Sequence, residues 1–313
     1  MTTQTAGSPP KAVSRPGDRI FAGASIGSGI LILASLAGVA GFLLWQAWPA
    51  LVAPAEQITG GKGLVAYIAP LLFGTVYSAF WALLIATPLA IGIALFITHY
   101  APRKLAQALG YLVDLLAAVP SLIFGLWGVY VLAPAAYPVT AWLADNLGFL
   151  PFFSSDASVT GRTMFTVAIV LGVMILPIMT AVNREVFLQT PRLHEEASLA
   201  LGATRWEMIQ MSVLPFGKSG IVSGMMLGLG RALGETMAVA IILSMSGGIS
   251  LDLVSNSNPG TIAGNIALQF PETSGLGTNV LIASGLVLFA VTLAVNMIAR
   301  WIVSRRSEFS GAN

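Results

Sequence analysis

Long apolar stretches alternate with short polar ones along almost the whole chain. Each apolar stretch reaches the length of about 20 residues that a helix needs to cross the hydrocarbon core of a bilayer. Charged residues are nearly absent from these stretches, as expected for helices that lie in lipid. The pattern predicts an all-α membrane protein with six transmembrane helices, at about 20–48, 69–98, 109–132, 164–182, 221–245 and 279–303.

The segments outside the apolar stretches define the domain organisation. Residues 1–19 are rich in Pro, Ser, Thr and Gly, which is typical of a disordered tail. We expect this tail and a second one at 307–313 to be cytoplasmic, with one six-span domain at 20–306 between them. Two stretches are expected to be loops: 133–162, rich in proline and aromatic residues, and 247–278, rich in Gly, Asn, Ser and Pro. Pro120 and Pro177 are expected to bend their helices.

Composition supports the membrane assignment. Hydrophobic residues make up 56% of the chain and charged residues 9%, with a mean hydropathy of +0.84. A soluble domain carries about 25% charged residues. The absence of cysteine excludes disulfides, and two histidines without metal spacing disfavour a zinc site.

The basic residues gather on one side of the predicted membrane. Twelve of the fifteen lysines and arginines fall in the N-terminal tail, in the loops near 99–108 and 183–219, and at the C-terminal end of the sixth span (Arg300, Arg305 and Arg306). Only Lys62 and Arg162 lie in the loops of the opposite side, and Arg231 lies within a span. Basic residues favour the cytoplasmic face, so this bias predicts that both termini are cytoplasmic.

Two charged residues lie near the middle of the predicted fifth span. A charge at the centre of a membrane helix costs about 2.5–3.5 kcal/mol on insertion scales, so Arg231 and Glu235 need compensation. Their spacing of four residues would place both side chains on one helix face. Two interpretations stay open: an ion pair that fixes helix packing, or a polar lining on the route of a hydrophilic, anionic solute.

The polar run before this span has the character of a docking element. Leu199, Trp206, Ile209 and Val213 recur at helical spacing and predict one apolar face. Gly202 divides the run into two short amphipathic helices, which suit the groove of a partner protein. Pro215 is expected to end the second helix before the fifth span.

Three matches to catalytic motifs do not hold. The Gly-x-Ser-x-Gly pattern at 23–27 lies inside a membrane helix and lacks the strand and turn of a hydrolase nucleophile elbow. Gly217-Lys218-Ser219 lacks the upstream glycine of a phosphate-binding loop, because Ser212 stands there. His194-Glu195 has no second histidine of a zinc protease. If ATP drives this protein, another chain must hydrolyse it.

The polar run also resembles a known motif. Glu196-Ala197-Ser198, then Gly202, then Leu214-Pro215 is similar to the EAA loop of ABC importer permeases, here at about 192–216. Ser198 replaces the usual second alanine of that motif, and Ser212 its isoleucine. The resemblance implies a type I ABC importer permease fold with a cytoplasmic coupling helix, and insertion of 196–201 into an ATPase subunit.

A second resemblance is more specific and covers nearly the whole chain. The strings LLAAVPS at 115–121, FGLWG at 124–128 and GMMLGLGRALGETMAV at 224–239 resemble PstC-type permeases of phosphate importers. The resemblance implies a role for Arg231 and Glu235 in phosphate passage. It also implies a second permease (PstA type), an ATPase dimer (PstB type) that binds ATP and Mg²⁺, and an external phosphate-binding protein (PstS type). No cofactor is expected in this chain.

The sequence therefore favours a non-catalytic permease subunit of an ATP-driven phosphate importer in a bacterial cell membrane. A related permease for phosphonate, sulfate or molybdate is the chief alternative. A self-contained secondary transporter is a further one, but it would not need cytoplasmic docking helices.

Overall fold

The computed structural model describes residues 16–58, 60–245 and 248–307. The expected tails at 1–15 and 308–313 therefore lie outside the described residues, whereas residues 16–19 already belong to the first helix. The described helices are α1 (Pro16–Val52), α2 (Leu64–Leu95), α3 (Arg103–Ala117), α4 (Ser121–Trp127), α5 (Ala133–Leu147), α6 (Met164–Leu188), α7 (Arg192–Ala200), α8 (Arg205–Met208), α9 (Leu214–Leu233), α10 (Met237–Ile242), α11 (Ile262–Gln269) and α12 (Leu276–Ser307).

Short turns extend several of these helices. π-Helical turns follow α2 (Phe96–Tyr100), α4 (Gly128–Leu132) and α8 (Ile209–Val213). 3-10 turns follow α1 (Ala55–Gln57) and α11 (Phe270–Glu272). Within the described residues, six helical stretches are long and apolar enough to cross a membrane. They are Gly17–Val52, Leu64–Tyr100, Ser121–Leu147, Met164–Leu188, Arg205–Leu233 and Leu276–Trp301. The prediction of an all-α protein with six membrane spans is confirmed at this level.

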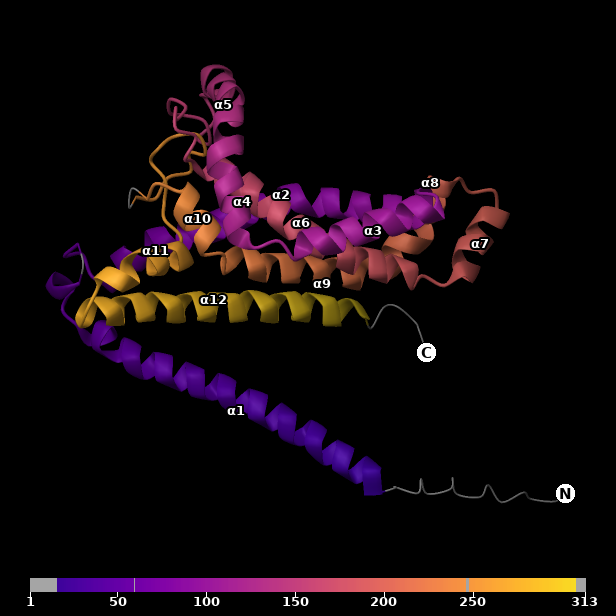
Figure 1. Ribbon diagram of the computed structural model, residues 1–313, viewed down its shortest axis with the longest axis horizontal. Coiled ribbons are helices and arrows are strands. Elements are labelled where there is room, and N and C mark those ends of the chain that lie inside the picture. The colour runs from indigo at the N-terminus through magenta and orange to yellow at the C-terminus, as the bar shows by residue number, and fades with distance from the viewer. Residues whose placement is uncertain (1–15, 59, 246–247, 308–313) are drawn as a thin grey trace.

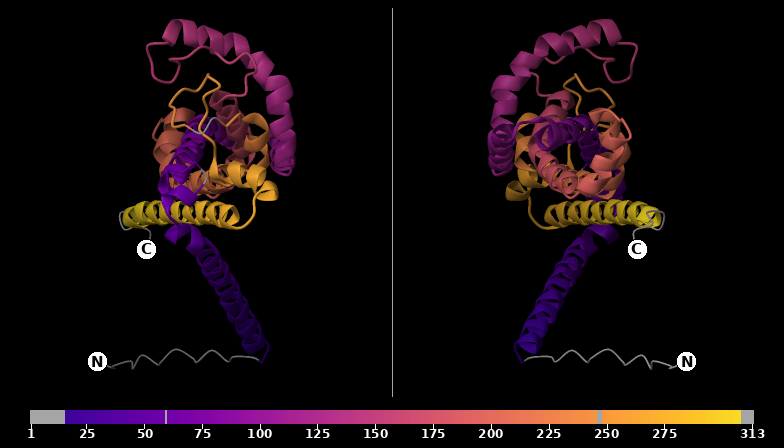
Figure 2. Two further views of the ribbon diagram at one scale, coloured as in Figure 1. Left: turned by 90° about the vertical axis from the view of Figure 1, so that its left-hand side faces the viewer. Right: turned by 90° about the vertical axis from the view of Figure 1, so that its right-hand side faces the viewer.

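The centre of the bundle is α6, which packs between α2 and α9 (Figures 1 and 2). Alanine recurs at every third or fourth position of α2, so the small side chains line one helix face and let α6 approach closely. Gly172 of α6 meets this face near the carbonyl oxygen of Ala82. The fully buried alanines of the stripe are Ala79, Ala82, Ala86 and Ala90.

The contact between α6 and α9 depends on glycine. A Cβ added at Gly220 would lie 2.7 Å from Cβ of Val186, and one at Gly228 would lie 2.8 Å from the sulfur of Met179. Real Cβ atoms do not come this close, so the two backbones are nearer than any other residue would allow. Glycine at this spacing is typical of tightly packed membrane helices.

The first helix stands apart from the bundle. Figure 1 shows α1 diverging from α12, with contact only near its C-terminal end. There Ala47 and Ala50 are buried against Val280 and Ala283 of α12. The rest of α1 presents apolar side chains to its surroundings, as suits a helix covered by lipid or by another membrane protein.

The predicted third span at 109–132 is wrong in its bounds. The chain leaves α3 at Ala117 and turns through Pro120, which has φ −58° and ψ 137° and precedes α4. Proline has no N–H to continue a helix and restricts the residue before it, so the apolar run divides there. α3 lies along the bundle and is joined to α6 by an ion pair between Asp114 and Arg184 (3.9 Å).

The stretch at 133–162, expected to be a loop, begins with helix α5 instead. Its alanine-rich sequence favours a helix, and α5 runs across the long axis of the bundle and arches beside it (Figures 1 and 2). The fourth span is also longer than predicted. α6 continues through Pro177 and includes Asn183, Arg184 and Glu185.

The stretch at 247–278 is expected to be a loop, but its described part, 248–278, contains α11 and a buried carboxylate that binds the backbone. Asp252 is buried and accepts hydrogen bonds from the backbone N–H groups of Ser155 (2.8 Å), Val254 (2.8 Å) and Ser255 (3.0 Å). Helices α7 and α8 lie at the end of the bundle opposite α10 and α11 (Figure 1). The start of α1 and the end of α12 point toward the same side. We call the end formed by α7 and α8 the coupling end.

Replacing Gly220 by alanine should destabilise the protein. The new Cβ would meet the stiff branched side chain of Val186, and overpacking of this kind typically costs about 1–3 kcal/mol. Thermal unfolding of the purified protein in detergent should show a lower midpoint. Gly92→Ala is the matched control, because nothing lies within 4 Å of a Cβ at that position. Equal midpoints for the two variants would contradict the packing argument.

Candidate coupling and transport site

Two short helices form the coupling end, as the sequence predicts. α7 ends in a turn in which Gly202 has φ +87°, a left-handed conformation that glycine adopts without strain. The N–H groups of Gly202 and Ala203 donate to the carbonyls of Leu199 (3.0 Å) and Ser198 (3.2 Å), which satisfies the end of α7. Glu196, Ala197 and Gly202 are exposed, whereas Ser198 is half-buried.

The second helix begins with a reciprocal cap. The backbone N–H of Thr204 donates to the carboxylate of Glu207 (2.8 Å), and the N–H of Glu207 donates to the hydroxyl of Thr204 (3.3 Å). Both groups would otherwise lack partners at a helix start. The turn and the cap together set the angle between α7 and α8.

The single apolar face predicted for this segment is wrong. Ile209 and Val213 are buried in a cluster with Phe187, but Leu199 and Trp206 are exposed. The turn at Gly202 interrupts the helical period, so Leu199 no longer shares a face with the later residues. Apolar side chains therefore point outward at the coupling end, with Leu201 90% exposed.

Pro215 does not end the second helix, contrary to expectation. Helix runs without a break over Arg205–Leu233, with a π-helical turn immediately before α9. Leu214 and Pro215 directly follow this π-helical turn, in which the N–H of Leu214 donates to the carbonyl of Ile209, so the missing N–H of Pro215 falls where the hydrogen-bond pattern changes. The coupling end is therefore continuous with the helix that carries Arg231.

The two positions at which the EAA-like motif departs from its usual residues contact each other. The hydroxyl oxygens of Ser198 and Ser212 lie 3.4 Å apart, and Ser212 also donates to the carbonyl of His194 (3.3 Å). The departures are thus complementary, and they hold α7 against the π-helical turn.

Arg231 and Glu235 do not lie on one helix, so the expectation that their side chains share one helix face is wrong. α9 ends at Leu233 with Gly234 as its cap, and the chain turns before α10 begins at Met237. Glu235 is 8% exposed, and its carboxylate accepts a hydrogen bond from the N–H of Ala238 (3.1 Å). It therefore caps α10, and neither ion pair of the described residues includes it.

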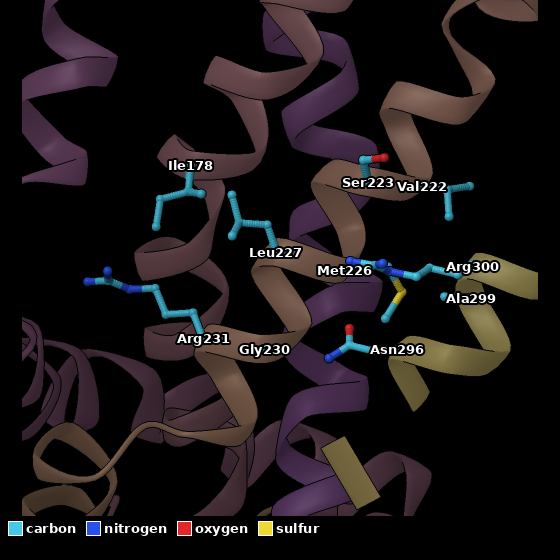
Figure 3. Close-up of a pocket in the computed structure, with 10 residues that line it drawn as sticks. All are labelled: Ile178, Val222, Ser223, Met226, Leu227, Gly230, Arg231, Asn296, Ala299 and Arg300. Atoms are coloured by element: carbon cyan, nitrogen blue, oxygen red, sulfur yellow. The ribbon is translucent and has the colours of Figure 1, made fainter. Parts of the chain in front are cut away.

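Arg231 instead lines a groove of about 770 Å³ beside α9. None of the described residues that line this groove is acidic, whereas Arg231 and Arg300 both line it. Figure 3 shows the two arginines at different parts of it, with Arg231 pointing away from Asn296 and Arg300. The Nε atom of Arg231 is buried without a hydrogen-bond partner. The remaining lining residues are Ile178, Val222, Ser223, Met226, Leu227, Gly230 and Ala299.

Arg162 fastens the far end of α10, a role that sequence reasoning missed. Its guanidinium donates to the carbonyls of Ile241 (2.8 Å) and Ile242 (3.2 Å). A cation is favourable at a helix C-terminus, just as Glu235 is at the N-terminus. The partners of Arg162 are backbone atoms about 80 positions away, so no local pattern in the sequence could reveal them.

Solved ABC transporters contain chains of a similar fold. A chain in the crystal structure of a bacterial alginate ABC transporter, in complex with an alginate pentasaccharide-bound periplasmic protein, has a TM-score of 0.63. It is 17% identical, and the match covers 92% of this chain and 95% of that one. A bacterial ABC transporter involved in the import of alginate has a TM-score of 0.56, at 18% identity and 92% and 99% coverage. The fold is that of ABC importer permeases.

Sequence relatives narrow the class. Residues 86–308 match the family model of the binding-protein-dependent transport system inner membrane component. Phosphate transport system permease protein PstC of Mycobacterium leprae is 46% identical, with 94% of this chain and 95% of that protein covered. PstC 2 of Mycobacterium tuberculosis is 44% identical, with 92% of each covered. The chain belongs to this permease family, within its group of PstC proteins.

Replacing Thr204 by alanine should loosen the start of α8. Loss of such a cap costs about 1 kcal/mol, so the amide of Glu207 should exchange with solvent about 5-fold faster. Hydrogen exchange of peptides covering residues 203–209 measures this. In the control Ser223→Ala, the lost hydroxyl donates only to a carbonyl of its own helix, that of Ser219. Unchanged exchange in Thr204→Ala would show that the cap does not hold the helix.

Proposed function

We propose that this chain is the transmembrane permease subunit of an ATP-driven importer of inorganic phosphate. It forms the translocation path with a second permease and is driven by an ATPase dimer. The observation that carries the proposal is the unbroken helix Arg205–Leu233, which joins the exposed coupling end to Arg231. The PstC proteins at 44–46% identity, named for phosphate transport, support phosphate as the solute.

Coupling begins at α7, where the Glu196–Leu201 stretch inserts into a groove of the ATPase. Leu193, Leu199 and Leu201 offer exposed apolar anchors for it, and exposed apolar surface of this kind is typical of a protein interface. Movement of the ATPase is then transmitted as a push along the continuous helix. Its 29 residues span roughly 44 Å at the helical rise.

Arg231 guides the anion. Its guanidinium has a planar fork of donors that matches two oxygens of a phosphate. The groove around it has no acid to compete, and low-polarity surroundings strengthen the attraction. Glu235 has a different role: it holds the start of α10 in place beside the end of α9. It does not adjust how tightly Arg231 binds the anion.

The proposed complex contains this permease, a second permease of the PstA type, an ATPase dimer of the PstB type and an external phosphate-binding protein of the PstS type. ATP and Mg²⁺ bind to the ATPase, and this chain carries no catalytic site. The coupling end and both termini face the cytoplasm, in agreement with the bias of basic residues.

Two alternatives are less well supported. A permease for phosphonate, sulfate or molybdate would use the same fold, but the PstC relatives are named for phosphate. A self-contained secondary transporter disagrees with the family match over residues 86–308.

Replacing Arg231 by glutamine should abolish phosphate uptake while the complex still assembles. Glutamine removes the charge that attracts the anion, and loss of a charged hydrogen bond costs about 1.5–3 kcal/mol, or at least 10-fold in rate. Uptake of radiolabelled inorganic phosphate by proteoliposomes containing the complex measures this. Arg231→Lys, which keeps the charge without the fork, should retain part of the uptake. Normal uptake by Arg231→Gln would exclude Arg231 from the path.

Replacing Leu201 by glutamate should release the ATPase. A buried charge without a partner is unfavourable in an apolar groove, so the ATPase should no longer copurify with the permease pair. Val159→Glu is the matched control, because Val159 is also exposed (76%) but lies outside the coupling end. Copurification that survives Leu201→Glu but not Val159→Glu would place the ATPase elsewhere.

A further inference from the structure

The coupling helices also touch the end of α2, a contact to which the proposed function gives no role. α2 continues into the π-helical turn Phe96–Tyr100, which carries His99. The side chain of His99 is 9% exposed, and its Nε2 atom lies 3.6 Å from a carboxylate oxygen of Glu195 on α7. An ion pair thus joins two segments that lie almost 100 positions apart in the sequence.

The other ring nitrogen of His99, Nδ1, contacts the side chain of Thr98. It lies 2.6 Å from the hydroxyl oxygen of Thr98, and that hydroxyl donates its hydrogen to the carbonyl of Ala94 (2.8 Å). The contact of Nδ1 with Thr98 orients the ring, so that Nε2 faces the carboxylate of Glu195.

The second coupling helix makes its own contact with the same turn. Arg205, the first residue of α8, donates from its guanidinium to the carbonyl of His99 (3.4 Å). The centre of that guanidinium lies 5.7 Å from the ring centroid of Tyr100, within the range of a cation–π interaction. Both α7 and α8 are therefore attached to the end of α2.

We propose that the contacts of His99 with Glu195, and of Arg205 with His99 and Tyr100, form a coupling latch that transmits movement of α7 and α8 to α2. The latch rests on the proposed function, because it needs an ATPase that moves α7. The continuous helix Arg205–Leu233 joins α8 to α9 but not to α2. With the latch, one movement of α7 and α8 drives α2 and α9 together.

Packing of the bundle makes this joint movement effective. The alanine stripe of α2 lies tightly on α6, and the end of α2 shares a buried cluster with Ile209, Val213 and Phe187. Close-packed helices move as rigid bodies rather than deforming. Because α6 packs tightly against both α2 and α9, a movement that reaches α2 and α9 together carries α6 with them, and the three helices turn as a unit.

The latch is tested in the full complex of both permeases, the ATPase dimer and the external binding protein, reconstituted in liposomes. Uptake of radiolabelled inorganic phosphate and hydrolysis of ATP are measured in the same samples, together with copurification of the ATPase. In His99→Ala and Glu195→Gln we expect the phosphate moved per ATP to fall by about 2- to 10-fold while the ATPase stays bound. The double variant should be no worse than either single variant, since both remove one contact.

Two further variants separate coupling from simple stability. Exchange of the two residues, His99→Glu with Glu195→His, should restore part of the ratio, because it rebuilds the pair. Arg103→Gln, which removes a nearby exposed charge that belongs to neither described ion pair, should keep the wild-type ratio. A wild-type ratio in both single variants would overturn the latch, and so would a double variant whose loss equals the product of the single losses. A wild-type complex that moves no phosphate with ATP would instead overturn the proposed function.

Discussion

The close contact between α6 and α9 is the interaction on which the rest of the structure depends. Inside a bilayer, apolar helices gain little by leaving lipid for one another, so shape and close approach must hold them together. Gly220 and Gly228 of α9 provide that approach to Val186 and Met179 of α6. Because α9 is continuous with α8, the position of the coupling end is set by the same contact.

The helix break after α9 is the second constraint. Backbone polar groups within a membrane must find partners inside the protein, so a broken helix needs caps at both new ends. Glu235 supplies the cap at the start of α10, and the N–H groups of Gly234 and Glu235 donate to carbonyls at the end of α9. Arg162 binds the carbonyls at the far end of α10. The buried carboxylate is thereby compensated without Arg231, which lines the groove beside α9. A charge that the sequence pairs with its neighbour is thus separated from it by the fold.

The spans could be predicted from the sequence because each apolar run is long enough to require a bilayer. The hairpin of α7 and α8 could also be predicted, because Gly202 is one of the few residues able to adopt its left-handed turn. The prolines could not be assigned in the same way. Pro120 divides a run, α6 continues through Pro177, and Pro215 lies at the start of α9 after a π-helical turn. Whether a proline divides a helix, lies within it or stands near its start depends on how neighbouring segments satisfy the backbone polar groups around that proline.

The sequence by itself determined the membrane class, the number of spans and the two short helices of the polar segment, because these follow from hydrophobic length and local turn chemistry. Only the tertiary structure decided which charges meet. Glu235 was predicted to face Arg231 from its spacing, yet the end of α9 at Gly234 turns it toward α10. His99 and Glu195 share no sequence pattern, and they meet because α2 and α7 reach the same end of the bundle. Contacts of this kind arise from helix packing, which links residues without regard to their distance along the chain.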